Sequence, residues 1–266
     1  MKKIYLSADI EGTCGIAHWD ETEIGKPGYD KFAAQMSREV AAACEGAQLG
    51  GADELFVKDA HDSARNIDVN LLPQCAHIFR GWARDPYIMM AGLDSSFSGV
   101  LFTGYHSGAD TDGNPLAHTM NGSLLRVAIN GEAASELHIN CLTAAMLGVP
   151  VLMVTGDEQL CEWARGVNPN IRTVPVSRGV GSGSVSMHPA LAVRRIREAA
   201  MAAVSGDPDA CRFPLPPSFT VGIRYREHAK AKVASFYPGA RADGPREVVF
   251  ETGDYYEALR FMFFCL

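Results

Sequence analysis

Strand-like and helix-like segments alternate along most of this chain, and the alternation limits the folds it can adopt. Short apolar runs predict strands at residues 3–9, 54–60, 77–81, 99–105, 126–131, 150–156 and 172–177. Segments with an apolar stripe or helix caps predict helices at 29–51, 135–148 and 188–206. Several strand runs are almost continuously apolar, which is typical of strands buried on both faces of a parallel sheet. We therefore expect a three-layer, doubly wound α/β fold with a mostly parallel sheet.

A proline-rich stretch separates the last part of the chain from this pattern. Residues 211–219, CRFPLPPSF, hold three prolines within four residues, which predicts a linker or a stiff turn. The following residues contain two strand-like and two helix-like runs, as in a small α+β unit. We expect a large α/β domain at 1–210 and a small α+β subdomain at 211–266.

Composition excludes several classes of partner. The net charge of −7 argues against nucleic acid or an anionic membrane surface as the main partner, because both attract basic surfaces. No apolar run approaches the ~20 residues that a membrane span requires. The first residues, MKKIYLSADIEG, reach acidic residues too early for a signal peptide.

The seven cysteines are odd in number and contain no C-x-x-C pair. This pattern predicts free thiols in a reducing compartment, and we expect the protein to be cytoplasmic. Cys14 lies beside the first group of acidic residues, and we interpret it as a buried loop residue with no assigned role.

Acidic residues and histidines gather where the predicted strands end. The first strand ends in D-I-E-G, and residues two apart on a strand point to one face, so Asp9 and Glu11 can converge. Four more such residues follow later strands or begin a helix, namely His61, His106, His118 and Glu136. Open α/β sheets bind ligands beyond the carboxyl ends of their strands, so these side chains can form one site.

Carboxylates and imidazoles are ligands of Zn²⁺ and related ions. A carboxylate shared by two ions is a common way to hold them about 3.5–4 Å apart. Such a site would relieve the repulsion between Asp9 and Glu11. Each residue also has an ordinary structural interpretation: Asp9 as a turn cap, Glu11 as a solvated acid, and the histidines as hydrogen-bonded core residues.

Five motifs make the pattern more specific. S-A-D-I-E-G, V-K-D-A-H, T-G-Y-H-S-G, A-H-T-M and A-S-E-L-H-I-N follow one another along the chain. In order and spacing they resemble the D-aminopeptidase family first known as a dipeptide transport protein. The resemblance implies two Zn²⁺ ions per subunit, bridged by Asp9. It implies that Glu11 and His106 complete one ion's site, and that His61 and Glu136 complete the other.

The same resemblance implies that His118 is the catalytic histidine and that the subunits form a ring-shaped homodecamer whose active sites face an internal channel. Lys58 and Ala60 stand where the family often has an amide and a hydroxyl. These differences affect the surroundings of a ligand and not the ligand itself.

The resulting hypothesis is a metal-dependent aminopeptidase. It would hydrolyse the N-terminal amide bond of short peptides that contain D-amino acids, such as D-Ala-D-Ala, with a water activated by two zinc ions. His118 could act as an oxyanion donor, a proton shuttle or a nucleophile. The alternatives are a metal-dependent hydrolase of another amide or of an L-peptide, and a non-catalytic protein that binds peptides for transport.

Overall fold

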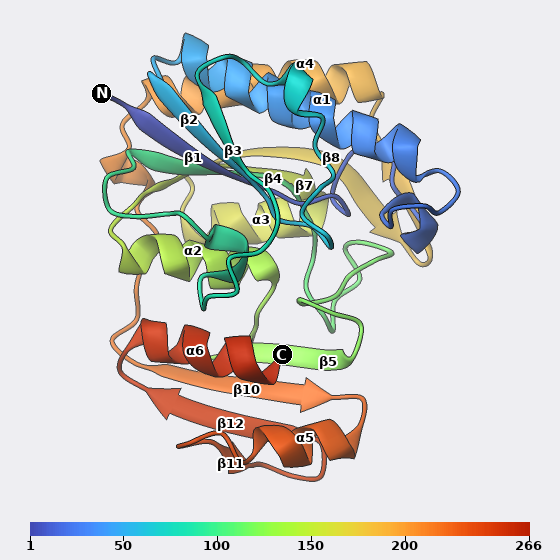
Figure 1. Ribbon diagram of the computed structural model, residues 1–266, viewed down its shortest axis with the longest axis vertical. Helices are drawn as coiled ribbons and strands as arrows, with labels where there is room; N and C mark the ends of the chain where they lie inside the picture. Colours follow the sequence, from blue (N-terminus) through green and yellow to red (C-terminus); the bar gives the residue numbers. More distant parts are fainter.

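The computed structural model describes residues 1–266 and contains two sheets (Figure 1). The large sheet has the strand order β3-β2-β1-β4-β7-β8-β9. Its strands are β1 (Lys3–Ala8), β2 (Glu54–Asp59), β3 (Ala76–Phe79), β4 (Gly99–Tyr105), β7 (Val151–Asp157), β8 (Arg172–Val180) and β9 (Gly183–Ser186). All neighbouring pairs are parallel except β8 with β9. The expected mostly parallel α/β sheet is thereby confirmed.

Helices cover both faces of the large sheet (Figure 1). They are α1 (Tyr29–Leu49), α2 (Glu136–Met146), α3 (Glu158–Val167) and α4 (Pro189–Ser205). α1 and α4 pack on one face, and α2 and α3 lie on the other. Every residue of β4 and β7 is buried, because apolar side chains from both helix layers pack against these strands. This is the expected three-layer, doubly wound arrangement.

The chain order places a topological switch at the centre of the large sheet. From β1 the chain adds β2 and β3 on one side, and then crosses to add β4, β7 and β8 on the other. The carboxyl ends of β1 and β4 therefore lie side by side while their connections leave in opposite directions. Such a point leaves a crevice in which open α/β folds bind ligands.

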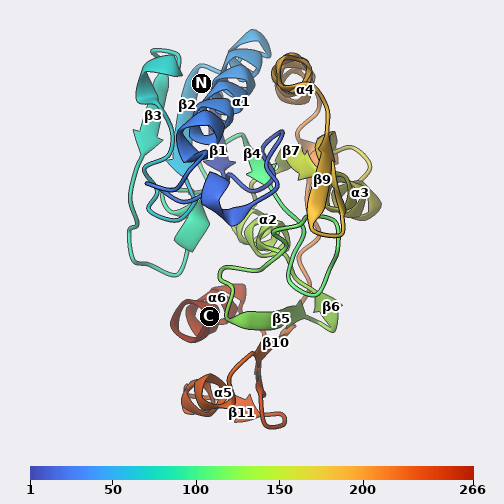
Figure 2. The same ribbon diagram turned by 90° about the vertical axis from the view of Figure 1, so that its right-hand side faces the viewer.

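The small sheet is antiparallel and has the order β11-β12-β10-β5-β6. Its elements are β5 (Leu124–Ile129), β6 (Glu132–Ala133), β10 (Phe219–Tyr225), β11 (Arg241–Ala242), β12 (Glu247–Thr252), α5 (His228–Ala234) and α6 (Tyr255–Cys265). α6 lies between this sheet and α2 (Figure 2). The expected strand–helix–strand–helix order after the prolines corresponds to β10, α5, β12 and α6. The division into 1–210 and 211–266 stays a prediction, and the small sheet crosses it, because β5 and β6 precede residue 210.

One local expectation differs from the structure. The run at 126–131 forms β5 of the small sheet rather than a strand of the large parallel sheet: no helix connects it to β4, and it pairs antiparallel with β6 and β10. β9 pairs with β8 as a hairpin. No helix in the structure combines the length and the apolar character that a membrane crossing requires.

Candidate metal centre

Three of the predicted site residues follow three adjacent strands of the large sheet. Asp9 follows β1 directly, His61 lies two residues after β2, and His106 follows β4 directly. Because β2 and β4 pair with β1 on opposite sides, the two histidines reach Asp9 from opposite sides. All three side chains are buried. They lie at the switch point described above.

The turn after β1 depends on Gly12 and Gly104. The Gly12 N–H donates to the Gly104 carbonyl at 2.8 Å, and a Cβ on Gly12 would overlap the Tyr105 carbonyl oxygen. Gly104 has φ +68°, and its Cβ would overlap the Asp9 carbonyl. Only residues without a side chain allow this approach. The two glycines therefore bring the end of β1 against the end of β4.

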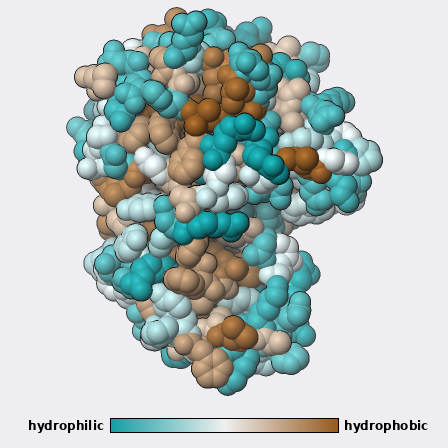
Figure 3. All heavy atoms as spheres, in the orientation of Figure 1, coloured by the Kyte–Doolittle hydropathy of each residue, from teal (hydrophilic) through white to brown (hydrophobic).

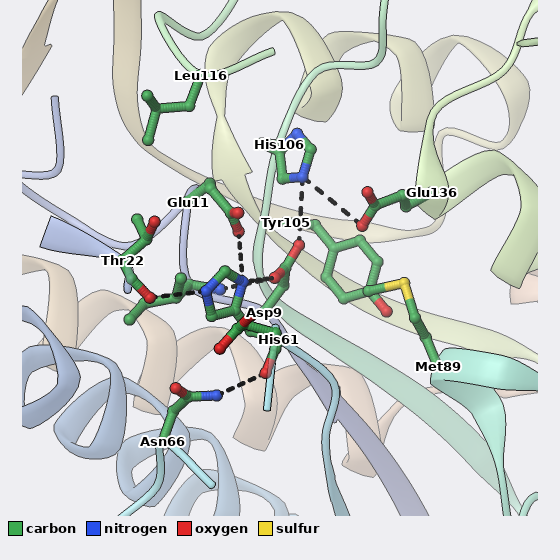
Figure 4. A network of polar contacts seen from close by, with 12 residues as sticks. Asp9, Glu11, Thr22, His61, Asn66, Met89, Tyr105, His106, Leu116 and Glu136 are labelled. Carbon is green, nitrogen blue, oxygen red and sulfur yellow. Dashed lines mark hydrogen bonds and ion pairs between the residues drawn. The ribbon is translucent and has the colours of Figure 1, made fainter. Parts of the chain in front are cut away.

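Asp9 presents its two carboxylate oxygens to different histidines (Figure 4). Its Oδ1 lies 3.4 Å from His61 Nδ1, and its Oδ2 lies 3.4 Å from His106 Nε2. His61 Nδ1 is also 3.2 Å from Glu11 Oε2, and His106 Nε2 is 3.6 Å from Glu136 Oε2. Two groups of potential metal donors thus share Asp9, and within each group the donor atoms lie within 4.8 Å of one another.

The shortest distances pair the donors differently from the two ligand sets that the family resemblance implies. Glu11 lies with His61, and Glu136 lies with His106, although a further group also joins Glu11 to His106 and His118. Glu136 is the first residue of α2, which packs beside β4, so it faces the histidine that follows β4. The five expected ligands and His118 are nevertheless all brought together.

Backbone carbonyls fix the orientation of all three imidazole rings. His61 Nε2 lies 2.8 Å from the Thr22 carbonyl, His106 Nδ1 lies 2.9 Å from the Ser107 carbonyl, and His118 Nδ1 lies 2.9 Å from the Leu116 carbonyl. A carbonyl oxygen only accepts, so each of these nitrogens donates. In the neutral rings the other nitrogen carries a lone pair aimed at the carboxylates, which is how histidine ligands are held in metal sites.

The electrostatics of the cluster favour a cation. Burial, together with the neighbouring Glu11 carboxylate, raises the pKa of Asp9 to about 6. Burial opposes the charged form of His61 and His106, but Glu11 acting on the first and Glu136 on the second raise the pKa of each ring well above its usual range. Three buried carboxylates therefore create a strongly negative potential at this point.

Three buried atoms of the cluster have no hydrogen-bond partner, namely Asp9 Oδ2, Glu11 Oε2 and His106 Nε2. Leaving buried polar atoms unpaired costs folding free energy, and cations bound within these donor groups would satisfy them. Carboxylate oxygens and imidazole nitrogens are the donors that Zn²⁺ prefers outside thiolate sites. The residues present therefore fit one or two ions of this type.

His118 lies at the edge of the cluster, toward the solvent. Its Nε2 is 3.6 Å from Glu136 Oε1 and 4.0 Å from Glu11 Oε1. Its ring stacks on His106, with centroids 4.3 Å apart and planes 9° apart, and Trp19 packs edge-on against it at 5.1 Å. The half-buried ring is thus held rigidly beside the donors.

Sequence reasoning missed the residues that hold the donors in place. Asn66 Nδ2 donates to the His61 carbonyl at 2.8 Å and to Asp59 Oδ1 at 2.9 Å, and Asn114 Nδ2 donates to the Glu11 carbonyl at 3.1 Å. Polar loop residues of this kind are common, and no sequence pattern distinguishes these two. Cys14 is buried as expected, and its thiol donates to the Met187 carbonyl at 3.0 Å.

A cavity of about 870 Å³ opens over the cluster. Asp9, Glu11 and Glu136 contribute to its lining, together with the rings of His61 and His118. Other lining residues come from the loops after β1, β2 and β3, and include Trp19, Arg65, Trp82 and Arg84. The volume lies within the range typical of small-molecule sites.

A doubly wound sheet with carboxylates and histidines buried at its switch point defines an α/β protein suited to bind cations beside a ligand cavity. The chain belongs to the family of peptidases described as D-aminopeptidases, whose model matches residues 1–264. This membership identifies it as an enzyme of the aminopeptidase class and confirms the resemblance drawn from the motifs.

Two comparisons with individual proteins agree with the family. The chain is 30% identical over 262 residues to a D-aminopeptidase of Bacillus subtilis (strain 168), covering 98% of this chain and 95% of the relative. Its structure is similar to that of a Zn-dependent D-aminopeptidase from Bacillus subtilis, described as a self-compartmentalizing protease. The TM-score is 0.91 at 29% identity, covering 99% of this chain and 96% of the other.

Proposed function

We propose that this protein is a zinc-dependent aminopeptidase that hydrolyses the N-terminal amide bond of short peptides containing D-amino acids. The observation that carries the proposal is the position of Asp9, whose two oxygens face different donor groups. Membership of the D-aminopeptidase family and the zinc dependence of the similar solved structure support it.

Two Zn²⁺ ions per subunit are the proposed cofactors. Asp9 would be shared, with Glu11 and His61 on one side and His106 and Glu136 on the other. When bound, such ions lower the pKa of a shared water and polarise the scissile carbonyl. The chain's own contribution is to hold five donors rigidly and to bury them away from bulk water.

His118 is the proposed catalytic histidine. Its Nδ1–H is engaged by the Leu116 carbonyl, so Nε2 is the atom that can exchange a proton with the substrate. Nε2 lies within 4.0 Å of carboxylate oxygens of Glu11 and Glu136, at the edge of the donor cluster. From this position it would pass a proton to the departing amine.

Metal content and hydrolysis together test the proposal. The purified protein is loaded with Zn²⁺, freed of unbound metal and incubated with D-Ala-D-Ala, L-Ala-L-Ala and mixed dipeptides. We expect two zinc ions per chain, release of free alanine that chelation abolishes, and a preference for D-residues at the N-terminus.

Asp9→Asn is the decisive variant, and Asp62→Asn is its matched control. Asp62 lines the same cavity but belongs to none of the donor groups. We expect Asp9→Asn to bind fewer zinc ions and to lose activity, whereas Asp62→Asn keeps both ions. Retention of both ions and of activity by Asp9→Asn would refute the site, and equal rates on L-peptides would reassign the substrate. Metal binding without any hydrolysis would favour a peptide-binding protein.

We also propose that the chain acts as a homo-oligomer, a ring-shaped decamer in the cytoplasm. The similar solved protein is described as self-compartmentalizing, which requires several copies. The small-sheet end exposes large apolar side chains: Val233 and Phe236 are each 74% exposed, and Phe264 is 67% exposed. Hydrophobic residues are visible on the surface of the lower part of the molecule, as on the upper part, in Figure 3. The seven free cysteines suit a reducing compartment.

A further inference from the structure

Two loops form one wall of the cavity over the metal centre. The first, residues 61–66, follows β2 and carries His61, and the second, residues 80–88, follows β3. The Gly81 N–H donates to the Ala64 carbonyl at 2.9 Å, and Trp82 Nε1 donates to the Asp62 carbonyl at 2.7 Å. A backbone hydrogen bond and a side-chain hydrogen bond therefore connect the two loops.

Lys58, a buried residue of β2, connects the same wall to this strand. Its ammonium donates to the Asp59 carbonyl at 2.6 Å and to the Gly81 carbonyl at 2.7 Å. It also lies over the Trp82 ring, 4.4 Å from the centroid. A buried cation with these contacts fixes the second loop relative to the strand that leads to His61.

Several residues that line the cavity also have an unusual backbone conformation. Four of the seven non-glycine residues with positive φ line this cavity, namely Asp62, Arg84, Ile88 and Met120. Left-handed conformations of such residues persist only where the surrounding structure enforces them, and they gather at ligand sites.

The wall presents two arginines to the cavity, Arg65 from the first loop and Arg84 from the second. Neither guanidinium has an acidic partner within 4.0 Å or a hydrogen bond to the protein. The metal centre forms another part of the cavity lining, and its carboxylates Asp9, Glu11 and Glu136 make that part strongly acidic. The wall also carries Asp62 and Asp85, so the cavity combines an acidic metal centre with a wall in which two arginines face the space without an acidic partner.

We propose that Arg65 and Arg84 bind the free C-terminal carboxylate of the substrate, and that they thereby select short, zwitterionic peptides. The inference rests on the proposed function, since it requires a peptide with its N-terminal bond at the metal centre. A guanidinium matches a carboxylate with two parallel hydrogen bonds. A sphere of the cavity's volume is ~12 Å across, and an extended residue spans about 3.5 Å, so the space suits a di- or tripeptide.

Kinetics with a free acid and its amide test this assignment. Zinc-loaded enzyme is assayed with D-Ala-D-Ala and with D-Ala-D-Ala amide, which differ only in the C-terminal charge. The variants are Arg65→Gln, Arg84→Gln, the double variant and the two Arg→Lys variants. Arg80→Gln is the matched control, because Arg80 is the first residue of the same loop but does not line the cavity.

We expect the wild type to prefer the free acid by about 10-fold to 100-fold in kcat/KM, as for a charge-assisted contact. Each Gln variant loses most of this preference through a higher KM for the acid with little change in kcat, and the Lys variants regain part of it. Arg80→Gln keeps the full preference.

The outcomes separate the two proposals. Equal hydrolysis of acid and amide by the wild type, or an undiminished preference in the double variant, overturns the arginine assignment and leaves the aminopeptidase intact. Hydrolysis of neither peptide by zinc-loaded enzyme overturns the proposed function, and the arginine assignment with it.

Discussion

Glu39→Gln is expected to change how the stability of this protein depends on pH. Glu39 lies on α1 and is fully buried, and its Oε1 accepts hydrogen bonds from the Cys14 N–H at 3.1 Å and from Gln35 Nε2 at 2.9 Å. Its Oε2 has no partner. It thus supports the loop that continues from the metal centre, while its ionised form is poorly solvated.

Burial raises the pKa of Glu39 from 4.5 to about 7 in the folded protein. Between these values the unfolded chain has released the proton and the folded chain retains it, so the folded state binds more protons. The contribution of Glu39 to the unfolding free energy is therefore fully present below pH 4.5 and is lost as the pH rises to about 7. A shift of this size corresponds to about 3 kcal/mol of unfolding free energy.

Glutamine keeps both hydrogen bonds through its carbonyl oxygen and has no proton to lose. The assay is urea unfolding of wild type and variant between pH 4 and pH 8, compared as the difference in unfolding free energy at each pH. We expect the unfolding free energy of the variant, minus that of the wild type, to increase by about 3 kcal/mol between pH 4 and pH 8.

Glu45→Gln serves as the control, because Glu45 is an exposed residue of the same helix, 3.2 Å from Arg197. Removal of such a surface pair changes stability by at most about 1 kcal/mol. A difference between wild type and Glu39→Gln that stays constant across the pH range would refute the reasoning about Glu39.

Two further predictions concern the site and the assembly. Gly12→Ala should destabilise the fold by about 1–3 kcal/mol and lower the zinc content, because the added Cβ would overlap the Tyr105 carbonyl. Thermal melting and metal analysis measure these two effects. The control is Gly166→Ala, which has open space around it and should instead stabilise α3. Phe236→Ser combined with Phe264→Ser should reduce the mass in light scattering toward the 28.7 kDa of one chain. An unchanged mass would place the subunit contacts elsewhere.

The large sheet and the positions of its donors could be predicted because both depend on local patterns. Near-continuous apolar runs indicate buried parallel strands, and a residue that follows such a run lies at the carboxyl edge of the sheet. Asp9, His61 and His106 all satisfy this condition. Their convergence then follows from the pairing of β2 and β4 with β1.

The small sheet was harder to predict, because pairing between distant strands has no local signal. Leu124, Val127 and Ile129 are buried while the residues between them are partly exposed, which indicates a strand with one covered face. That pattern, with Arg126 in the run, favours an antiparallel sheet. Nothing near residue 124 indicates that its partner β10 begins about 95 residues later.

The orientation of the imidazole rings could not be predicted for a related reason. Their partners are carbonyls of Thr22, Ser107 and Leu116, and every residue carries a carbonyl, so only the folded path of the backbone selects these three. A motif therefore indicates which atoms can bind a metal, and the loops decide where those atoms point.

The loop after β2 joins the metal centre to the proposed substrate contact. It carries His61 at its start, Arg65 near its end, and Asn66, whose side chain links the His61 carbonyl to Asp59. Asp59 also accepts the backbone N–H groups of Asn66 and Ile67, at 2.6 and 2.9 Å. His61, a proposed metal donor, and Arg65 are thus positioned by one buried carboxylate. A shift of this loop would move both together, so in the proposed complex the distance between the scissile bond and the carboxylate bound by Arg65 would be set by this short segment rather than by the relative motion of two domains.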